Sequence, residues 1–258
     1  MTDRLRRLGR WGPPAAVFLA VLAGWELWVR AAGIQGFLLP PPTEVIRTLR
    51  QEWNVVWAAG FFTLREALGG LFGGTVLGVL AAFAASRWVV IREGVMPFYV
   101  AMGAAPIIAL APITNQWFGI TNPVSKMTVV AVMVFFPVMI NMTRGLGEVG
   151  SDKLELMKSV AASEGSTLRK VRLPNALPYL FSALKVAVVL SLIGAIVAEY
   201  FGGSRDALGV YISQQAGLTR MAEAWSGIVV ATLLGAALQL LIVLAERLLI
   251  PWHPSLRG

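Results

Sequence analysis

Residues 175–198 read NALPYLFSALKVAVVLSLIGAIVA, and this stretch decides the class of fold. The only charged side chain in it is that of Lys185. A helix needs about 20 apolar residues to cross a bilayer, where each backbone N–H and C=O group must be hydrogen-bonded within the segment. The stretch therefore predicts a transmembrane α-helix.

Similar stretches recur along the chain, and the composition agrees with them. The chain has 258 residues, of which 57% are hydrophobic and 14% charged, whereas soluble domains carry roughly 25% charged residues. We expect an all-α integral membrane protein in which residues 1–258 form one transmembrane domain with six transmembrane helices. The other five spans are expected at residues 13–29, 67–85, 95–118, 127–143 and 225–245.

Basic residues set the expected orientation. Most lysines and arginines fall in the two terminal segments and in the loops after the second and fourth spans. Short loops rich in these residues stay cytoplasmic. We therefore expect a multi-pass protein of the bacterial inner (plasma) membrane with both termini in the cytoplasm. We therefore attribute the net charge of +8 to basic residues in the cytoplasmic loops and termini rather than to a surface that binds nucleic acid.

Reactive and metal-binding side chains are scarce in this sequence. There is no cysteine, which excludes disulfides and thiolate metal sites. The single histidine, His253, lies in the basic C-terminal tail, so we expect no metal site and no catalytic residues. A membrane enzyme is therefore disfavoured.

The segment before the second span predicts a helix that lies along the outer membrane surface. Pro40, Pro41 and Pro42 interrupt the chain, and apolar residues then recur at helical spacing. We expect this periplasmic interfacial helix at residues 43–57, with its apolar face toward the bilayer.

The second span carries Gly70, Gly74 and Gly78 at intervals of four residues. Small residues at this spacing form a stripe along one face of a helix, against which another helix can approach closely. That partner helix belongs either to this chain or to a second subunit.

The longest polar stretch lies between the fourth and fifth spans, at residues 144–174, in the cytoplasm. Asp152 and Glu155 predict the capping box of a first helix, and Ser163 predicts the cap of a short second helix that runs through Leu168. A helix-turn-helix with an apolar edge, held outside the membrane, is suited to contact with another protein.

Residues 155–174 read ELMKSVAASEGSTLRKVRLP, and this run resembles the "EAA" loop of the permeases of binding-protein-dependent ABC importers. The spacing from Glu155 through Ala161 and Val171 to the closing Leu-Pro pair agrees with that loop. The stretches FLLPPPTEV (37–45), PIIALAPITNQWFG (106–119) and AEYFGG (198–203) are similar to the nitrate, sulfonate and taurine branch of these permeases. Permeases for thiamine-precursor pyrimidines and for riboflavin are similar too.

The resemblance implies a type I ABC importer permease with a coupling helix in the cytoplasmic loop. It implies that an ABC ATPase subunit, in two copies, docks on this loop, that a second permease chain forms a homodimer, and that a solute-binding protein delivers the cargo. The cargo would be a small organic solute, either a sulfonate- or nitrate-like anion or a pyrimidine- or flavin-type vitamin or precursor. The coupling residues are then Glu155, Met157, Val160, Ala161, Ala162, Ser163, Glu164, Gly165, Leu168, Leu173 and Pro174.

ATP is expected on a partner chain. The sequence contains no Gly-rich loop followed by Gly-Lys-Ser/Thr, the motif that cradles phosphates in many ATPases. We therefore expect no cofactor in this chain, with ATP and Mg²⁺ on the partner ATPase, and a translocation subunit that is not itself an enzyme. Alternating access would be driven by the ATPase.

Two residues depart from the loop pattern of the family. Ala161 stands at the position of a glycine, and we expect it to preserve the turn only if its φ is negative. Gly165 stands where relatives often have a large aromatic residue, and we expect it to loosen the second helix by about 0.5–1 kcal/mol relative to alanine.

Polar residues inside the spans are candidates for the translocation path. Lys185 either faces this path or extends its ammonium group to the cytoplasmic interface. Glu199 either shapes the mouth of the path or pairs with Arg65, and an ion pair is expected between Glu26 and Arg30. A self-sufficient secondary transporter or channel is the alternative function. The path candidates are Asn115, Gln116, Lys185, Glu199 and Gln239.

Overall fold

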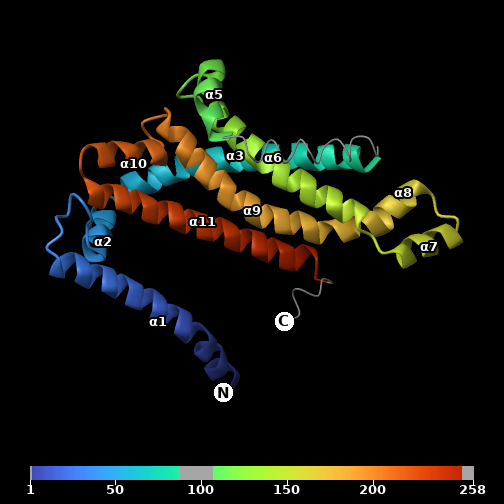
Figure 1. Ribbon diagram of the computed structural model, residues 1–258, viewed down its shortest axis with the longest axis horizontal. Coiled ribbons are helices and arrows are strands. Elements are labelled where there is room, and N and C mark those ends of the chain that lie inside the picture. Colours follow the sequence, from blue (N-terminus) through green and yellow to red (C-terminus); the bar gives the residue numbers. More distant parts are fainter. Residues whose placement is uncertain (1, 88–106, 252–258) are drawn as a thin grey trace. The chain divides into compact units, whose positions relative to one another are not determined.

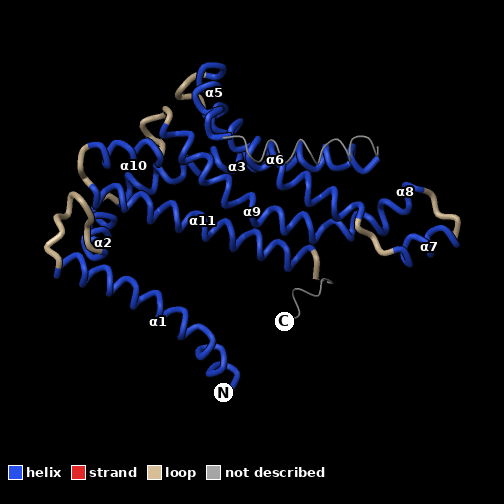
Figure 2. The backbone as a smooth tube through the Cα atoms, viewed as in Figure 1, coloured by secondary structure: helices blue, strands red, loops and turns tan. Residues whose placement is uncertain are grey.

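The computed structural model describes residues 2–87 and 107–251, with side chains from residue 12 onward, and all of its regular structure is helical (Figures 1 and 2). The long helices are α1 (Thr2–Ala31), α3 (Trp53–Arg87), α6 (Pro123–Gly147), α9 (Leu173–Tyr200) and α11 (Met221–Leu249). Shorter helical elements connect them: α2 (Pro42–Gln51), η1 (Ile107–Leu110), α5 (Ala111–Phe118), α7 (Ser151–Ser159), α8 (Glu164–Thr167), η2 (Leu168–Arg172) and α10 (Leu208–Gly217).

The long helices match the apolar stretches of the sequence. Among the described residues, five helices are long and apolar enough to cross a membrane. They contain the expected spans at 13–29, 67–85, 127–143, 175–198 and 225–245. The expected span at 95–118 falls partly on residues 88–106, outside the described residues, and its last part is η1 and α5. The all-helical membrane fold is confirmed, while the number of six spans stays a prediction.

The interfacial helix expected at 43–57 is shorter in the structure. Helix α2 ends at Gln51, Glu52 leaves the helical conformation, and Trp53 begins α3. The rings of Trp53 and Trp57 stack with centroids 4.9 Å apart, as residues four positions apart on one helix can. The apolar spacing is the same on both sides of Glu52, so periodicity alone could not show the break.

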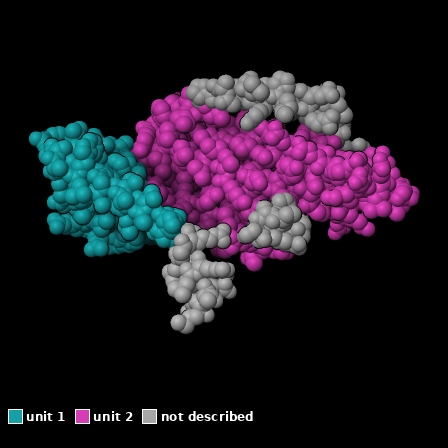
Figure 3. All heavy atoms as spheres, turned by 60° about the horizontal axis from the view of Figure 1, so that its bottom comes forward, with its two compact units in different colours: residues 1–58, 211–230 teal, residues 59–210, 231–258 magenta. Residues whose placement is uncertain are grey.

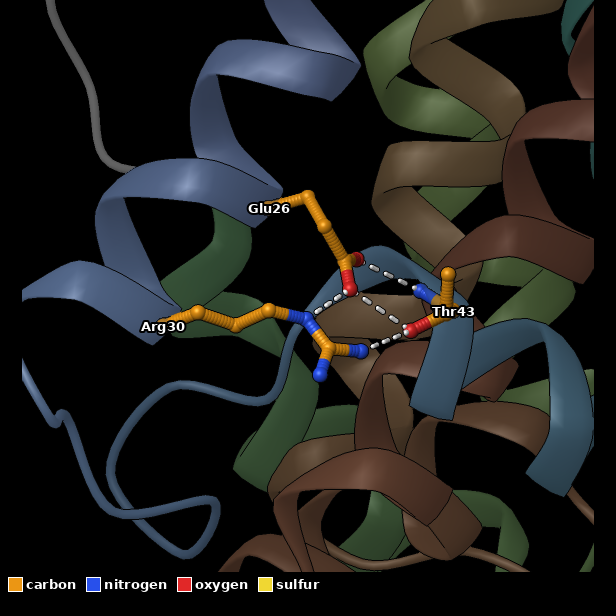
Figure 4. Close-up of polar contacts among 3 residues, drawn as sticks. All are labelled: Glu26, Arg30 and Thr43. Carbon is orange, nitrogen blue, oxygen red and sulfur yellow. Dashed lines mark hydrogen bonds and ion pairs between the residues drawn. The ribbon is translucent and has the colours of Figure 1, made fainter.

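The chain divides into two compact units, residues 1–58 with 211–230 and residues 59–210 with 231–258, which Figure 3 shows in different colours. In the first unit, Glu26 of α1 holds the start of α2 (Figure 4). Its carboxylate accepts hydrogen bonds from the backbone N–H of Thr43 at 3.0 Å and from the Thr43 hydroxyl at 2.8 Å. Helix α2 has no side-chain cap of its own at Pro41, so a carboxylate from another helix occupies the N-terminal position where negative charge is stabilised.

The expected pair of Glu26 and Arg30 is present in the same cluster. Arg30 Nε donates to Glu26 Oε1 at 2.6 Å, and Arg30 Nη2 donates to the Thr43 hydroxyl at 3.1 Å. The ion pair therefore also orients the residue that joins α1 to α2 (Figure 4).

In the second unit, glycines let helices approach closely. A Cβ atom placed on Gly74 would lie 2.5 Å from the carbonyl oxygen of Ala131 on α6, and one on Gly78 would lie 2.8 Å from that of Phe135. A Cβ on Gly70 would overlap Val130 of α6. The structure thus places the glycine stripe of α3 against α6 of the same chain, where van der Waals contact replaces the missing hydrophobic drive between membrane helices.

Helices α6 and α9 lie side by side along most of their length (Figure 1). They run antiparallel, because α6 leads into α7 and α8, from which the chain returns as α9. We call the end that carries α7 and α8 the loop end and the opposite end, where α5 precedes α6, the α5 end.

Candidate functional site

The polar segment at the loop end stays outside the packed helices. None of residues 151–175 is buried, and the side chains of Leu156 and Val160 are each 64% exposed. Leu154 and Met157 in the same segment are half-buried. Apolar side chains this exposed outside a membrane span mark a contact surface.

Helix α7 begins earlier than the capping box predicts. It starts at Ser151, its N-cap is Gly150 without a side-chain hydrogen bond, and Asp152 lies in the first turn. The expected cap at Asp152 is therefore wrong. A carboxylate inside the first turn still interacts favourably with the positive end of the helix dipole. Asp152 therefore stabilises the start of α7 through its charge rather than through a capping hydrogen bond.

The turn after α7 is a Schellman motif. The N–H of Ala162 donates to the carbonyl of Met157, and the N–H of Ala161 donates to that of Lys158, each at 2.9 Å. This pattern places Ala161 at the position after the C-cap, where glycine is usual because φ is positive. Ala161 has φ of 49° and the turn is nevertheless formed, so the expectation that alanine preserves this turn only with a negative φ is wrong. The alanine occupies a conformation that glycine adopts without strain.

Ser163 caps the helix that follows, and its hydroxyl accepts a hydrogen bond from the N–H of Ser166 at 3.3 Å. The helix does not stop near Leu168, as the sequence suggested, but continues without a break from Glu164 to Tyr200. Residues 168–172 form a wider turn of π-helix, in which the N–H of Leu173 donates to the carbonyl of Leu168. This turn lies directly before Pro174, which lacks an N–H and would clash with the carbonyl of Lys170 in an ordinary α-helix.

The two ends of the segment are tied together at its base. The side-chain amide of Asn175 donates to the carbonyls of Gly145 at 2.9 Å and of Glu148 at 3.1 Å. The hydroxyl of Tyr179 donates to the Glu148 carboxylate at 3.1 Å. Asn175 therefore satisfies carbonyls that the end of α6 leaves without intrahelical partners, and it fixes the start of α9 to that end.

The remaining loop residues differ in their exposure. Glu155, Glu164 and Gly165 are exposed, whereas Leu168, Leu173 and Pro174 are half-buried. A Cβ atom on Gly165 would meet nothing within 4 Å, so the position has room for a larger side chain. The structure thus leaves open space where related loops often carry an aromatic residue.

At the α5 end, polar side chains from several helices meet in the interior. Lys126, at the start of α6, is 1% exposed, and its ammonium donates to Asn115 Oδ1 at 2.9 Å and to the carbonyl of Ile120. Glu199, at the end of α9, is also 1% exposed. It accepts from the hydroxyl of Thr63 at 2.7 Å and from the N–H of Gly209 at 2.6 Å. We call Thr63, Glu66, Asn115, Lys126 and Glu199 the buried polar cluster.

Comparison with known proteins identifies the family. Residues 74–252 match the model of the family described as "Binding-protein-dependent transport system inner membrane component". The chain belongs to this family. It is therefore a multi-pass permease of the inner membrane, and membership of a binding-protein-dependent system implies a solute-binding partner and an ATPase.

Individual relatives agree over nearly the full length of the permease. It is 29% identical to the riboflavin transport system permease protein of Chloroflexus aurantiacus, over 99% of this chain and 97% of that protein. It is 30% identical to the formylaminopyrimidine transport permease protein of Halalkalibacterium halodurans, over 93% and 95% of the two chains. The taurine transport system permease protein of Escherichia coli is 25% identical over 91% and 88%. The expected branch of the family is confirmed.

A solved structure supports the fold. The crystal structure of an amino acid ABC transporter with histidines contains a chain that superposes with a TM-score of 0.60 at 16% identity. The match covers 77% of the permease and 96% of that chain. The permease therefore shares its fold with that chain.

The structure distributes the five path candidates among different environments. Asn115 and Glu199 belong to the buried polar cluster, Gln116 is exposed, and Gln239 is half-buried with its Oε1 lacking a hydrogen-bond partner. Lys185 forms an ion pair with Glu246 of α11 at 2.5 Å. The sequence suggested that Lys185 either faces the translocation path or extends to the cytoplasmic interface. Neither alternative included an ion pair with Glu246.

Sequence reasoning missed Glu66, Lys126 and Glu246 as parts of polar sites. Glu66 and Lys126 stand directly before the expected spans at 67–85 and 127–143, outside the stretches that were expected to cross the membrane. Helix α3 begins at Trp53, well before Glu66, and α6 begins at Pro123, one turn before Lys126, and both side chains are buried. The sequence did contain a signal, because each of these charged residues lies at the edge of an apolar stretch. A charged residue in such a position lies either at the membrane interface or inside the membrane, and charged residues inside the membrane often belong to functional sites.

Proposed function

We propose that this permease is the translocation subunit of an ATP-driven importer, and that residues 144–174 are the coupling loop on which a separate ATPase subunit docks. The protein itself supplies no ATPase site; ATP and Mg²⁺ bind to the partner. In this assignment the loop end and both termini face the cytoplasm, and the α5 end faces the solute-binding protein.

The observation that carries the proposal is the combination of an exposed apolar surface and a rigid connection to the membrane. Leu156 and Val160 protrude from α7, while α8 is the first turn of the unbroken helix that becomes α9. Asn175 and Tyr179 fasten the base of the loop to the end of α6. A force applied to α7 and α8 is therefore transmitted to α6 and α9 rather than absorbed by a flexible linker.

The proposed transport cycle uses this connection. ATP binding closes two ATPase subunits, the coupling loops of two permease copies move with them, and α6 and α9 shift together so that the path opens toward the outside. The solute-binding protein then releases its cargo into the path, and hydrolysis reverses the movement. The remaining loop residues, Ala161 to Ser163, set the angle between α7 and α8.

The cargo class follows from the relatives. Their names specify riboflavin, formylaminopyrimidine and taurine, which are small organic solutes that are flat heteroaromatic compounds or carry an anionic group. We propose a solute of this kind. We expect two copies of the permease to enclose the path. Many apolar side chains on the long helices of one copy are exposed, and a second copy would cover part of them.

The docking role is tested by charging the exposed apolar surface. The variant Leu156→Asp/Val160→Asp should lose the ATPase subunit that co-purifies with the tagged permease from its native membranes. The variant Ser151→Asp adds a carboxylate at an exposed position on the opposite face of α7 and should retain it. Equal recovery of the ATPase with all three proteins would refute the docking surface.

The importer is distinguished from a self-sufficient transporter by reconstitution. Vesicles that contain the permease alone should show no uptake of the cargo held by its solute-binding protein, and uptake should require both the ATPase and ATP. Uptake by the permease alone, driven by an ion gradient, would overturn the proposal in favour of a secondary transporter.

A further inference from the structure

The buried polar cluster contains two carboxyl groups and one ammonium group. Glu66 and Glu199 are 2% and 1% exposed, and Lys126 is 1% exposed and lies close enough to interact with the charge of both. Burying an ionised carboxylate without a partner is so costly that such groups are paired or neutral. With one cation for two carboxyl groups, one additional positive charge is needed to balance the cluster.

The hydrogen bonds distinguish the two carboxyl groups. Both oxygens of Glu199 accept hydrogen bonds, Oε1 from the Thr63 hydroxyl and Oε2 from the Gly209 N–H, and such bonds stabilise the ionised form. Glu66 has no comparable support, because its Oε2 is buried without any hydrogen-bond partner. The carboxyl group of Glu66 also lies within hydrogen-bonding range of that of Glu199.

Two ionised carboxylates in this position would repel each other in an interior from which water is excluded, and neither could donate a hydrogen bond to the other. A protonated Glu66 solves both problems, because its O–H donates to the Glu199 carboxylate. The orphaned oxygen of Glu66 is then the carbonyl oxygen of a neutral acid, which costs much less to bury than a charged one.

We propose that Glu66 and Glu199 form a proton-binding site, in which Glu66 holds one proton at neutral pH and donates it in a hydrogen bond to Glu199. The ionised Glu199 and the ammonium of Lys126 are then the two full charges of the cluster. Tyr200, next to Glu199, is a further titratable group that interacts with this carboxylate. This proposal does not depend on the coupling loop or on the identity of the cargo.

The site joins the elements that meet at the α5 end. Thr63 and Glu66 belong to α3, Glu199 ends α9, Gly209 lies in the first turn of α10, and Lys126 begins α6. Asn115 extends the cluster into α5 through Lys126. The bound proton is therefore part of what holds α3 to α9 here, and its loss places two like charges between these helices. Packing at the α5 end becomes dependent on pH.

The proton can be observed directly. Infrared spectra of the purified full-length protein at neutral pH should contain the carbonyl stretch of a protonated, buried carboxylic acid. This band should disappear in Glu66→Gln, whose amide can donate to Glu199 as the acid does. It should remain in Glu246→Gln, a matched control, because Glu246 is equally buried but ion-paired with Lys185. Absence of the band from the wild-type protein, or its persistence in Glu66→Gln, would overturn the proposal.

Thermal unfolding provides a second readout. The folded protein holds a proton that Glu66 of the unfolded chain releases at neutral pH, so raising the pH favours the unfolded state. The unfolding temperature of the wild-type protein should therefore fall between neutral and alkaline pH, and it should fall less in Glu66→Gln than in Glu246→Gln. The same pH dependence in all three proteins would contradict a proton bound at Glu66.

Discussion

The turn between α7 and α8 offers the sharpest test of the loop geometry, through the substitution Ala161→Gly. Ala161 has φ of 49°, a left-handed conformation that costs about 1–2 kcal/mol for a residue with a Cβ atom. Glycine removes this cost but gains conformational entropy in the open state, which offsets roughly 0.5–1 kcal/mol. We therefore expect Ala161→Gly to stabilise the turn by about 0.5–1 kcal/mol.

Native-state amide hydrogen exchange measures this effect where it occurs. The N–H groups of Ala161 and Ala162 form the two hydrogen bonds of the Schellman motif, so their exchange reports the opening of the turn. A stabilisation of about 0.5–1 kcal/mol corresponds to exchange about two- to fivefold slower in Ala161→Gly, since about 1.4 kcal/mol is tenfold. Global unfolding should change little, because the loop is exposed.

The matched control is Ala162→Gly, one residue further along. Among the described residues other than glycine, only Ala161 and Thr219 have a positive φ, so glycine at 162 gains nothing and adds entropy to the open state. It should destabilise the turn by about 0.5–1 kcal/mol and accelerate exchange. If the two substitutions act in the same direction, the left-handed conformation at Ala161 is wrong.

Two further predictions concern packing and the base of the loop. Gly74→Ala places a Cβ atom 2.5 Å from the carbonyl oxygen of Ala131 and should destabilise the protein by about 1–3 kcal/mol. The control Gly73→Ala, whose Cβ meets nothing within 4 Å, should be neutral or slightly stabilising. Thermal unfolding in detergent distinguishes the two variants, and a similar loss of stability in both would refute the contact between α3 and α6. Asn175→Ala removes the hydrogen bonds to the carbonyls of Gly145 and Glu148 and should cost about 1–2 kcal/mol of local stability. Amide hydrogen exchange should become faster in the last turn of α6 and the first turn of α9. Unchanged exchange in these turns would contradict the role of Asn175.

Several properties follow from the sequence by itself, because they depend on composition and local order along the chain. Apolar stretches of about 20 residues require helices in a bilayer, whatever those helices pack against, so the helical class of fold and five of the spans could be read directly. The EAA-like run at residues 155–174 carried the resemblance to the family for the same reason, since a motif is a local spacing. Ser163 as a helix cap was equally local.

Only the tertiary structure decided which side chains meet. Glu66, Lys126 and Glu199 lie on three helices, and Lys185 and Glu246 lie on two, so no spacing along the chain reveals that they come together. The sign of φ at Ala161 and the unbroken helix through Pro174 depended on hydrogen bonds that a residue pattern does not specify. The apolar pattern of a membrane helix indicates which segment is buried. The free-energy cost of burying a charge in that segment depends on its partner side chains, and these are brought to it only by the tertiary structure.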